Sequence, residues 1–461
     1  VNVAQLKNAA DAAKVHFYSV NSTDSTKGNY NNNGASGADA LAAGVGAQAE
    51  ADHSIAIGTN AHTQDSNGKK GSGDIAVGYG AHTNNYADQS GSIAIGQNAF
   101  AENMAGQQEA AFAFGQTTYD GNLLSQARIP ADPSKVPGGM AIGQNTYVRT
   151  GGLMVGTHNY KGKLGDVEVD SAHTENNAKN VFETTLGTNS FNSGAFSTIT
   201  GAYSIASGSY AGGRNTSDAG KNFGATIMGS LNSIESATAS NSYSGVANSI
   251  VGTANRTFNS NGSLIFGAGN EITNSVTTIS APTDGGDSAQ ALQQTLMKKV
   301  QSSNGGGATL AIGGGNKADY AQQSQLLGVG NTLTGTSSSI SKFNMLDGYR
   351  NTATNVSNTK IIGSNNTVND KADSNTIIGD KHVVAAEKTN NVIIGNADQE
   401  LTTSASNAVL IGHNANVSVD DGVALGSGSI ASTDKGAIGY DLKGEDHSSD
   451  TTGTWKSTPF L

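Results

Sequence analysis

The sequence lacks cysteine, is poor in aromatic residues and contains no long apolar run. None of its 461 residues is Cys, and aromatic residues make up 6% of the chain. The absence of cysteine excludes a disulfide framework and fits either redox compartment. The scarcity of aromatic residues leaves Ala, Ile, Val and Leu to build a thin core. No apolar run approaches the roughly 20 residues that a transmembrane helix needs.

Basic residues are also in the minority. The chain holds 26 Lys and Arg against 37 Asp and Glu, which gives a formal net charge of −11. Nucleic-acid binding depends on a basic stripe, so this balance predicts no nucleic-acid partner. The apolar share of 36% is low enough for a disordered chain to be considered. The regular placement of the apolar runs argues for a folded chain instead.

Glycine is abundant, with 61 residues, and much of it lies in one repeated unit. The unit is a short apolar run, a Gly and a polar pair, as in residues 54–61 (SIAIGTNA). Close copies are residues 74–81 (DIAVGYGA) and 92–99 (SIAIGQNA), and looser copies include 360–365 (KIIGSN) and 409–415 (VLIGHNA). A persistent repeat of this kind predicts a stacked, solenoid-like architecture.

Each apolar run is long enough for one short strand. Side chains alternate along a strand, so Ile55 and Ile57 share one face and Ala56 lies on the other. Both faces are apolar, which predicts that both are covered. The Gly suits a turn that a Cβ would resist. Asn or Ser beyond the Gly suits a turn closed by side-chain bonds to the local backbone.

The spacing of the repeated Gly predicts the size of one solenoid turn. From Gly363 to Gly439, successive repeats are 13 to 17 residues apart. That length fits two short strands and two turns, and such units bury their apolar faces only when they are stacked. About twenty copies, at roughly 4.8 Å per stacked strand, predict a rod on the order of 100 Å long.

Residues 1–20 have a different period from the rest of the chain. Their apolar residues recur at steps of three and four, which predicts the seam of a short coiled-coil helix. These residues are Val3, Leu6, Ala10, Ala13, Phe17 and Val20. We expect a stub of a stalk or neck in an oligomer, with an amphipathic capping helix on a monomer as the alternative.

The remaining segments follow from where the repeat is regular. We predict a polar linker in residues 21–37 and regular repeats in residues 38–116. In residues 117–307 we predict the same roll with long loop insertions. In residues 308–440 the repeats return to regular spacing. Residues 441–461 lose the repeat, contain the single Trp and predict a connector towards a neck or Trp-ring module. From the sequence at both ends, we predict that this chain is a piece of a longer protein.

The loop insertions are the candidate ligand-binding regions, because rigid scaffolds commonly carry function on loops. They lie at residues 117–138, 160–181, 204–224 and 279–307, and neutral surface insertion is the alternative for each. The last contains a predicted helix, in which Leu292, Leu296 and Lys299 or Val300 share a face. The candidate ligand-binding residues are exposed cations and aromatic residues: Tyr119, Arg128, Tyr160, Lys161, Lys163, Lys298 and Lys299.

The repeat units resemble the head repeats of YadA-like trimeric autotransporter adhesins. The similarity is closest in SIAIGTNA, DIAVGYGA and SIAIGQNA, quoted above. Residues 1–7 (VNVAQLK) are similar to the neck and coiled-coil passages of that family, and residues 436–441 (GAIGYD) with Trp455 resemble the exit of such a head. The similarity is specific in residues 38–116 and 359–440 and approximate in 117–306.

The resemblance implies an all-β fold, a left-handed parallel β-roll in which three identical chains pack side by side. It also implies a non-enzymatic adhesin head on the cell surface, carried by a fibre that is anchored in the outer membrane by a translocator outside this segment. Its partner would be a host cell, a matrix protein, a glycan or another bacterium. We expect virulence, colonisation or coaggregation as its role, with export by type V secretion.

Two other functions remain open. One is a structural spacer within a longer fibre. The other is a hexapeptide-type acyltransferase, because residues 362–368 mimic the repeat of those trimeric enzymes, with His382 or His413 as the base. That repeat needs an apolar residue at every sixth position, and here the register breaks at Ser374 and Asn390.

A metal site is the last alternative. His62 and His82 hold the same place in their repeats, so in a trimer each would form a ring of three if it faced the axis. Three imidazoles could bind a metal ion. A polar turn residue in solvent is the simpler interpretation. We therefore predict no metal, no cofactor and no catalytic residue.

Overall fold

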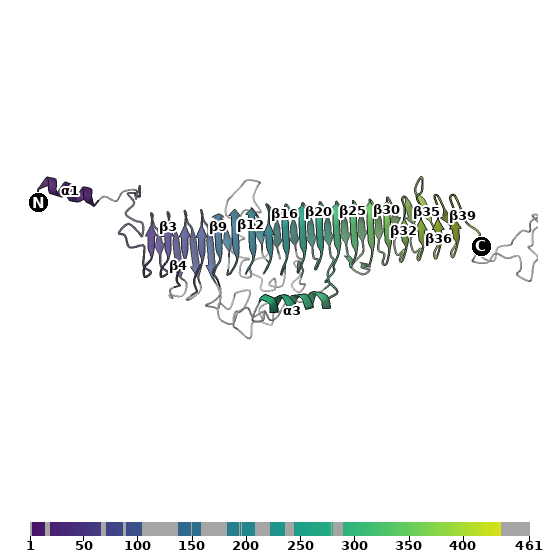
Figure 1. Cartoon of the computed structure of the whole chain (residues 1–461), viewed down its shortest axis with the longest axis horizontal. Coiled ribbons are helices and arrows are strands. Elements are labelled where there is room, and N and C mark those ends of the chain that lie inside the picture. Colours follow the sequence, from purple (N-terminus) through teal and green to yellow (C-terminus); the bar gives the residue numbers. More distant parts are fainter. Residues whose placement is uncertain are drawn as a thin grey trace, which may run out of the picture.

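The protein is a long rod of stacked parallel strands (Figure 1). The computed structural model describes residues 2–13, 19–65, 71–85, 89–103, 137–148, 150–157, 182–192, 194, 196–207, 222–235, 244–277, 279 and 289–434. The strands lie side by side along the long axis, and their order along the rod follows the sequence from the N-terminal to the C-terminal side. The predicted parallel β-roll is confirmed.

The main sheet has 19 strands, and each pairs in parallel with the next one along the rod. We call it the first sheet. Its strands are β1 (Leu41–Ala43), β3 (Ile55–Ile57), β5 (Ile75–Val77), β7 (Ile93–Ile95), β9 (Met140–Gln144), β11 (Leu153–Thr157), β12 (Thr184–Thr188), β14 (Thr198–Thr200), β16 (Thr226–Ser230), β18 (Ser249–Thr253), β20 (Leu264–Ala268), β22 (Leu310–Gly314), β25 (Gln325–Val329), β28 (Met345–Tyr349), β30 (Lys360–Ser364), β32 (Thr376–Ile378), β34 (Val392–Ile394), β36 (Val409–Ile411) and β38 (Val423–Leu425).

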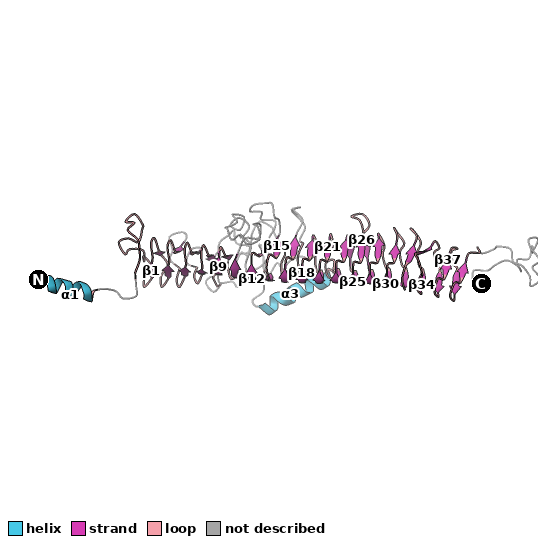
Figure 2. Ribbon diagram, turned by 90° about the horizontal axis from the view of Figure 1, so that it is seen from above, coloured by secondary structure: helices cyan, strands magenta, loops and turns pink. Residues whose placement is uncertain are grey.

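The opposite side of the roll consists of shorter parallel sheets, which we call together the second sheet (Figure 2). Its N-terminal strands are β2 (Gln48–Ala49), β4 (His62–Asp65), β6 (His82–Asn85), β8 (Phe100–Asn103) and β10 (Tyr147–Val148). Its middle strands are β13 (Phe191–Asn192), β15 (Ile205–Ser207), β17 (Ser233–Glu235), β19 (Arg256–Phe258), β21 (Glu271–Thr273), β23 (Lys317–Asp319), β26 (Thr332–Thr334), β29 (Thr352–Thr354), β31 (Thr367–Val368), β33 (His382–Val384) and β35 (Leu401–Thr403). Its last strands are β37 (Asn416–Val417) and β39 (Ile430–Ala431), and β24 (Ala321–Gln322) pairs separately with β27 (Ser341–Lys342).

One rung of the roll is therefore a first-sheet strand, a turn at the repeated Gly and, in most rungs, a second-sheet strand. The repeated Gly residues stack in one column, with Gly348 opposite Gly363 in register. Gly363 has φ +147°, and a Cβ on it would lie 1.9 Å from the carbonyl oxygen of Gly379 in the next rung. Only Gly fits such a column, because both the backbone conformation and the close approach exclude a side chain.

The turn after the Gly differs from the prediction in one respect. The Asn two residues after the Gly takes a positive φ, as at Asn60 (+55°) and Asn98 (+52°). Asn98 does not close its own turn, because its side-chain amide donates to Asn145 in the next rung at 3.1 Å. Side-chain bonds therefore join rungs at this position. The predicted bonds within one turn occur at other positions, where Asn331 donates to the Leu327 carbonyl at 2.8 Å and Ser429 to the Leu425 carbonyl at 2.7 Å.

The core lies between the two sheets and is thin. The second residue of each first-sheet strand points inward, for example Ala56, Ile265 and Ile361, and each of these is 0% exposed. Second-sheet residues such as Ile272 and Val368 meet them from the other side. The expected core of Ala, Ile, Val and Leu is confirmed.

Two helices of the described residues lie outside the roll. Helix α1 (Val3–Ala12) begins with a capping box, in which the Asn2 side chain accepts from the Gln5 amide at 2.8 Å and Gln5 Oε1 accepts from the Asn2 amide at 3.0 Å. It is shorter than the predicted 1–20, because Val20 is not helical and Phe17 lies outside the described residues. Helix α3 (Ala289–Ser302) confirms the predicted helix and lies alongside the rod (Figure 1).

Candidate functional site

The outward face of the first sheet is mostly apolar along the rod. Each strand presents two outward residues there, the one before the repeated Gly and the one two places earlier. Most of the large exposed apolar side chains of the described residues belong to this face, among them Leu41, Ile95, Phe266, Ile378 and Leu425. Phe266 is 56% exposed. Apolar surface of this extent on a polar chain marks an interaction site.

One prediction concerns this face. The apolar alternation in SIAIG predicted cover on both sides of the strand. In the single chain only Ala56 is buried, whereas Ile55 is half-buried and Ile57 is 38% exposed. The larger side chains therefore point out of the roll and the small one fills it.

The second sheet carries a different outward surface near its N-terminal end, a column of stacked rings. His62 and His82 have ring centroids 5.1 Å apart, His82 and Phe100 are 4.9 Å apart, and Phe100 and Tyr147 are 5.2 Å apart with nearly parallel planes. Glu102 accepts a hydrogen bond from the Tyr147 hydroxyl at 2.6 Å. The shared place of the two histidines was evident from the sequence, but the two rings that continue the column were not.

The histidines of this column are poor candidates for a metal site. His62 Nε2 lies 3.0 Å from a carboxylate oxygen of Glu50, and His82 Nε2 lies 3.0 Å from Gln64 Oε1. Burial of the His82 ring, with the neighbouring His62, lowers the pKa of His82 to about 4. Both rings lie on the second sheet and not on the apolar face. Among the described residues, no group of three or more His, Asp or Glu could hold a metal ion.

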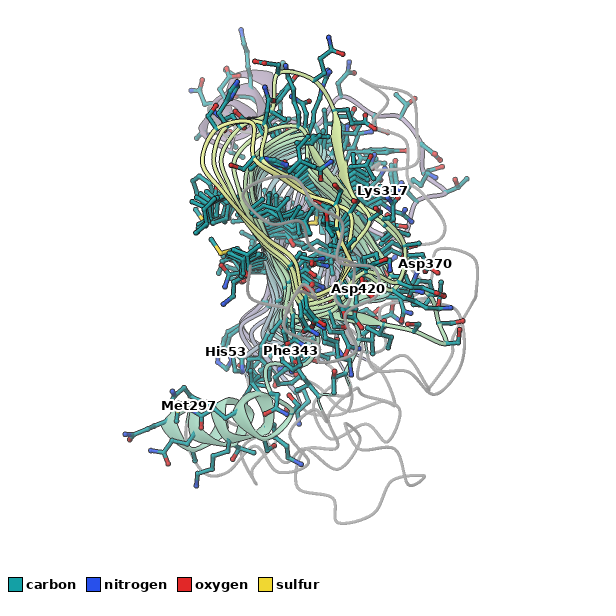
Figure 3. All side chains as sticks on the ribbon, turned by 90° about the vertical axis from the view of Figure 1, so that its right-hand side faces the viewer. His53, Met297, Lys317, Phe343, Asp370 and Asp420 are labelled. Carbon is teal, nitrogen blue, oxygen red and sulfur yellow. The ribbon has the colours of Figure 1, made fainter. Side chains whose placement is uncertain are left out.

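Further along the second sheet the outward column becomes charged. Arg256 contacts Glu235 at 3.1 Å and Glu271 at 2.9 Å, and Lys317 lies 3.8 Å from Glu271. The two carboxylates, Glu235 first, raise the pKa of Arg256. The Arg256 guanidinium also lies 5.0 Å from the centre of the Phe258 ring. Lys317 marks this side of the roll in the view along its axis (Figure 3).

The candidate ligand-binding residues separate into two groups. Lys298 and Lys299 lie on α3, where Lys298 is exposed and Lys299 is half-buried in the last turn. The others lie outside the described residues: Tyr119, Arg128, Tyr160, Lys161 and Lys163.

Helix α3 approaches the roll through Leu296. Leu296 is half-buried. Its Cδ2 atom would lie 3.6 Å from a Cβ atom if residue 224 carried one in place of Gly. Met297, next along the helix and labelled in Figure 3, is 42% exposed. Lys298, the following residue, is exposed to solvent.

The interior holds a polar column that was not predicted from the sequence. Seven Asn side chains stack at the third position after the repeated Gly: Asn232, Asn255, Asn270, Asn316, Asn331, Asn351 and Asn366. The Asn351 side-chain amide donates to Asn331 Oδ1 at 3.0 Å and to the Gly363 carbonyl at 2.7 Å. The column thus satisfies buried backbone carbonyls of the turn. Its signal in the sequence was the recurring Gly-x-x-Asn.

His382 takes the next place in this column. Its amide donates to Asn366 Oδ1 at 2.9 Å, and its Nε2 lies 2.7 Å from the Gly395 carbonyl oxygen. The residue is 1% exposed, and burial lowers its pKa. A ring closed inside the roll does not reach an external substrate, which counts against His382 as an acyltransfer base. His413, the other candidate, is exposed and lies 3.3 Å from Asp398.

The comparisons with known proteins point to one family. The profile of the YadA head domain repeat (2 copies) matches residues 35–61, 70–99 and 404–429. No significant match was found among curated protein sequences. In the part of the chain that the structure describes, no helix has the length and apolar character needed to cross a membrane. The match supports an adhesin-type role and a place on the cell surface, as the resemblance implied.

Proposed function

The chain carries YadA-type head repeats near both ends of its roll, and we propose that three copies form the rigid head of a surface adhesin. The observation that carries this proposal is the outward face of the first sheet, which is mostly apolar between Leu41 and Leu425 and which one chain leaves exposed. A partner that covers the whole of this face must be as long as the rod, and further copies of the same rod meet that condition.

Helix α1 supports the same assembly. Val3 is 83% and Leu6 is 65% exposed, and no residue of the helix is buried. A helix of ten residues is marginal on its own. Three such helices would cover one another's apolar residues as a short coiled coil.

Attachment is proposed to occur through the loops on the outside of the trimer. The cations Arg128, Lys161, Lys163, Lys298 and Lys299 would meet an anionic glycan, matrix protein or cell surface. Three copies on one rod add avidity, so each contact need be only weak. Because these contacts are electrostatic, raised salt should weaken attachment.

The test is attachment of the purified protein to a panel of cells, matrix proteins and glycans. It is compared with a variant in which residues 117–136 and 160–181 are replaced by short turns. We expect the parent to bind and the variant to lose binding while it stays folded and trimeric. Binding by both proteins at equal strength would contradict the loop assignment.

The two helix lysines allow a finer version of this test. Lys298→Gln removes an exposed charge, whereas Lys299 lies in the last turn, where a cation also favours the helix by a few tenths of a kcal/mol to about 1 kcal/mol. Lys298→Gln should therefore reduce attachment without changing stability. Unchanged attachment by Lys298→Gln would remove α3 from the adhesive surface.

A structural spacer is the second candidate, and the shape of the molecule favours it. The roll separates the two ends of the described chain along one straight axis (Figure 1). A spacer predicts that neither the parent nor the loop variant binds, while a longer fibre keeps its adhesion when the loops are deleted.

A further inference from the structure

We propose that Asp347 and Lys360 form an ion pair between neighbouring copies of this chain, and that this pair fixes how the copies are aligned. The inference rests on the proposed homotrimer. It concerns one place on the apolar face of the first sheet, where strands β28 and β30 are adjacent.

These two residues are exceptional on their face. Each of the 19 strands presents two outward residues before its repeated Gly, and among all of them only Asp347 and Lys360 are charged. They have opposite signs and lie on adjacent strands. In register, Asp347 lies between Leu327 and Ile362, and Lys360 lies between Met345 and Thr376.

The two charges are not paired with each other or with another described residue of the chain. In register, Met345 lies opposite Lys360 and Asp347 lies opposite Ile362, so the charged residues are diagonal neighbours. Diagonal side chains on a sheet are roughly 7–8 Å apart. Among the described ion pairs, none within 4.0 Å includes either residue. Lys360 is exposed and Asp347 is half-buried.

Covering the face with another copy would make both charges costly unless they met opposite charges. A lone buried charge is strongly unfavourable, whereas an ion pair with good geometry offsets much of that cost. The chain itself supplies the complementary partner, because every copy carries one acid and one base. The face is therefore self-complementary as well as apolar.

The positions of the two residues suit a threefold arrangement in particular. Asp347 belongs to the outward column next to the repeated Gly, and Lys360 belongs to the column two residues earlier. These columns lie towards opposite edges of the face. In a ring of three parallel rods, the first column of one copy meets the second column of its neighbour. Asp347 then faces Lys360 of the next copy. The two residues are one rung apart along the rod, and the long Lys side chain can span that distance.

The experiment compares four forms of the full chain by sedimentation over a range of concentrations. They are the parent, Asp347→Lys, Lys360→Asp and the double reversal. Each single reversal places like charges at every interface and should weaken trimer formation by at least about 30-fold. The double reversal should restore it. Lys317→Glu, a reversal on the second sheet, is the matched control and should leave the trimer intact.

A mixing experiment separates a pair between chains from a pair within one. The Asp347→Lys chain and the Lys360→Asp chain carry different tags and are expressed together. A pair between chains predicts that mixed trimers form in preference to unmixed ones, because unlike neighbours place the introduced lysine of one chain against the introduced aspartate of the other. No preference for mixed trimers, with the double reversal still restored, would place the pair within one chain and overturn the proposal.

The remaining outcomes are also decisive. If the parent is a trimer and neither single reversal weakens it, the ion pair is wrong while the proposed function stands. If the parent is a monomer at all concentrations, the proposed homotrimer fails and the inference fails with it. A twofold dimer that the single reversals disrupt would also overturn the threefold arrangement.

Discussion

The N-terminal rungs, residues 41–103, and the rungs of the Asn column, residues 226–368, have the same backbone plan but different interiors. In the N-terminal rungs the third residue after the repeated Gly is Ala, as at Ala61 and Ala81, and each is 0% exposed. In the later rungs it is Asn, as at Asn331 and Asn351, which are equally buried. Small apolar residues fill one region, and a hydrogen-bonded column fills the other.

This difference shows which part of the repeat defines the roll. The family profile matches residues 35–61, 70–99 and 404–429, and these segments contain rungs of the Ala type. The Asn column lies outside the matched segments, yet its strands continue the same sheet in the same register. The Gly column and the strand register are common to both regions, so they carry the fold while the filling varies.

The largest effect is expected when the Gly column itself is broken. Gly363→Ala places a Cβ 1.9 Å from the Gly379 carbonyl oxygen at φ +147°, and Gly58→Ala places one 2.5 Å from the Gly78 carbonyl oxygen at φ +125°. Both should cost more than about 3 kcal/mol of local stability, with the larger loss at Gly363. Hydrogen exchange resolved by segment measures this for each region.

Gly315→Asn is the matched control for these two substitutions. Gly315 has φ +63° and no atom within 4 Å of its Cβ position, and Asn occupies the equivalent place in other rungs, as at Asn365. It should therefore change local stability by less than about 1 kcal/mol. Equal losses at Gly315 and Gly363 would show that the close approach between rungs is unimportant.

The second prediction tests the polar column. Asn331→Ala removes the donor to the Leu327 and Gly348 carbonyls and the acceptor for the Asn351 amide. Leaving these buried groups without partners should cost about 2–4 kcal/mol. Thr332→Ala, on the adjacent half-buried residue, should cost much less. If exchange in residues 325–351 is as slow in Asn331→Ala as in the parent, the column does not stabilise this region.

The sequence alone predicted the roll because its strongest signals are local. The apolar run, the Gly and their spacing recur in one dimension, and each rung contacts mainly its neighbours. The helix at 289–302 was predicted for the same reason, from the spacing of Leu292 and Leu296. Such features need no knowledge of which distant residues meet.

The candidate site was less predictable because it depends on what faces outward. SIAIG is apolar on both sides, and only the structure places Ile57 outside and Ala56 inside. The ring column needs His82, Phe100 and Tyr147 in register, and Tyr147 lies 45 residues after Glu102, with which it bonds. Insertions of variable length hide such register from a single sequence.

The third prediction uses acid to compare the two regions. The folded pKa of His82 is about 4 and that of an ordinary His is 6.5, so below pH 6.5 the unfolded chain binds a proton that the folded chain does not. Stability of the N-terminal rungs should fall as the pH drops from about 6.5 to about 4, by at most about 3 kcal/mol. The pKa of His382 is lowered as well, so the rungs around it should weaken in the same direction.

Two substitutions separate these effects. His82→Phe continues the ring column, and His382→Asn continues the Asn column, and both remove the titrating group. Each should abolish the acid weakening of its own region and leave the other region unchanged, as measured by hydrogen exchange at about pH 7 and about pH 4.5, on either side of the ordinary His pKa. Acid weakening that persists in both variants would assign it to other groups.

The smallest effect is expected from the outward columns of the second sheet, where the comparison is between stacked rings and ion pairs. Arg256→Met removes the contacts with Glu235 and Glu271 and should cost about 1 kcal/mol at low salt, because partly exposed networks contribute little. At about 1 M salt the parent should lose most of this contribution, since the Debye length falls to about 3 Å. Phe100→Ala should instead cost the same at both salt concentrations, because ring stacking involves no net charge. Equal salt dependence in the two variants would mean that the charged column is stabilised by packing of the Arg256 side chain on Phe258 and not by its charge.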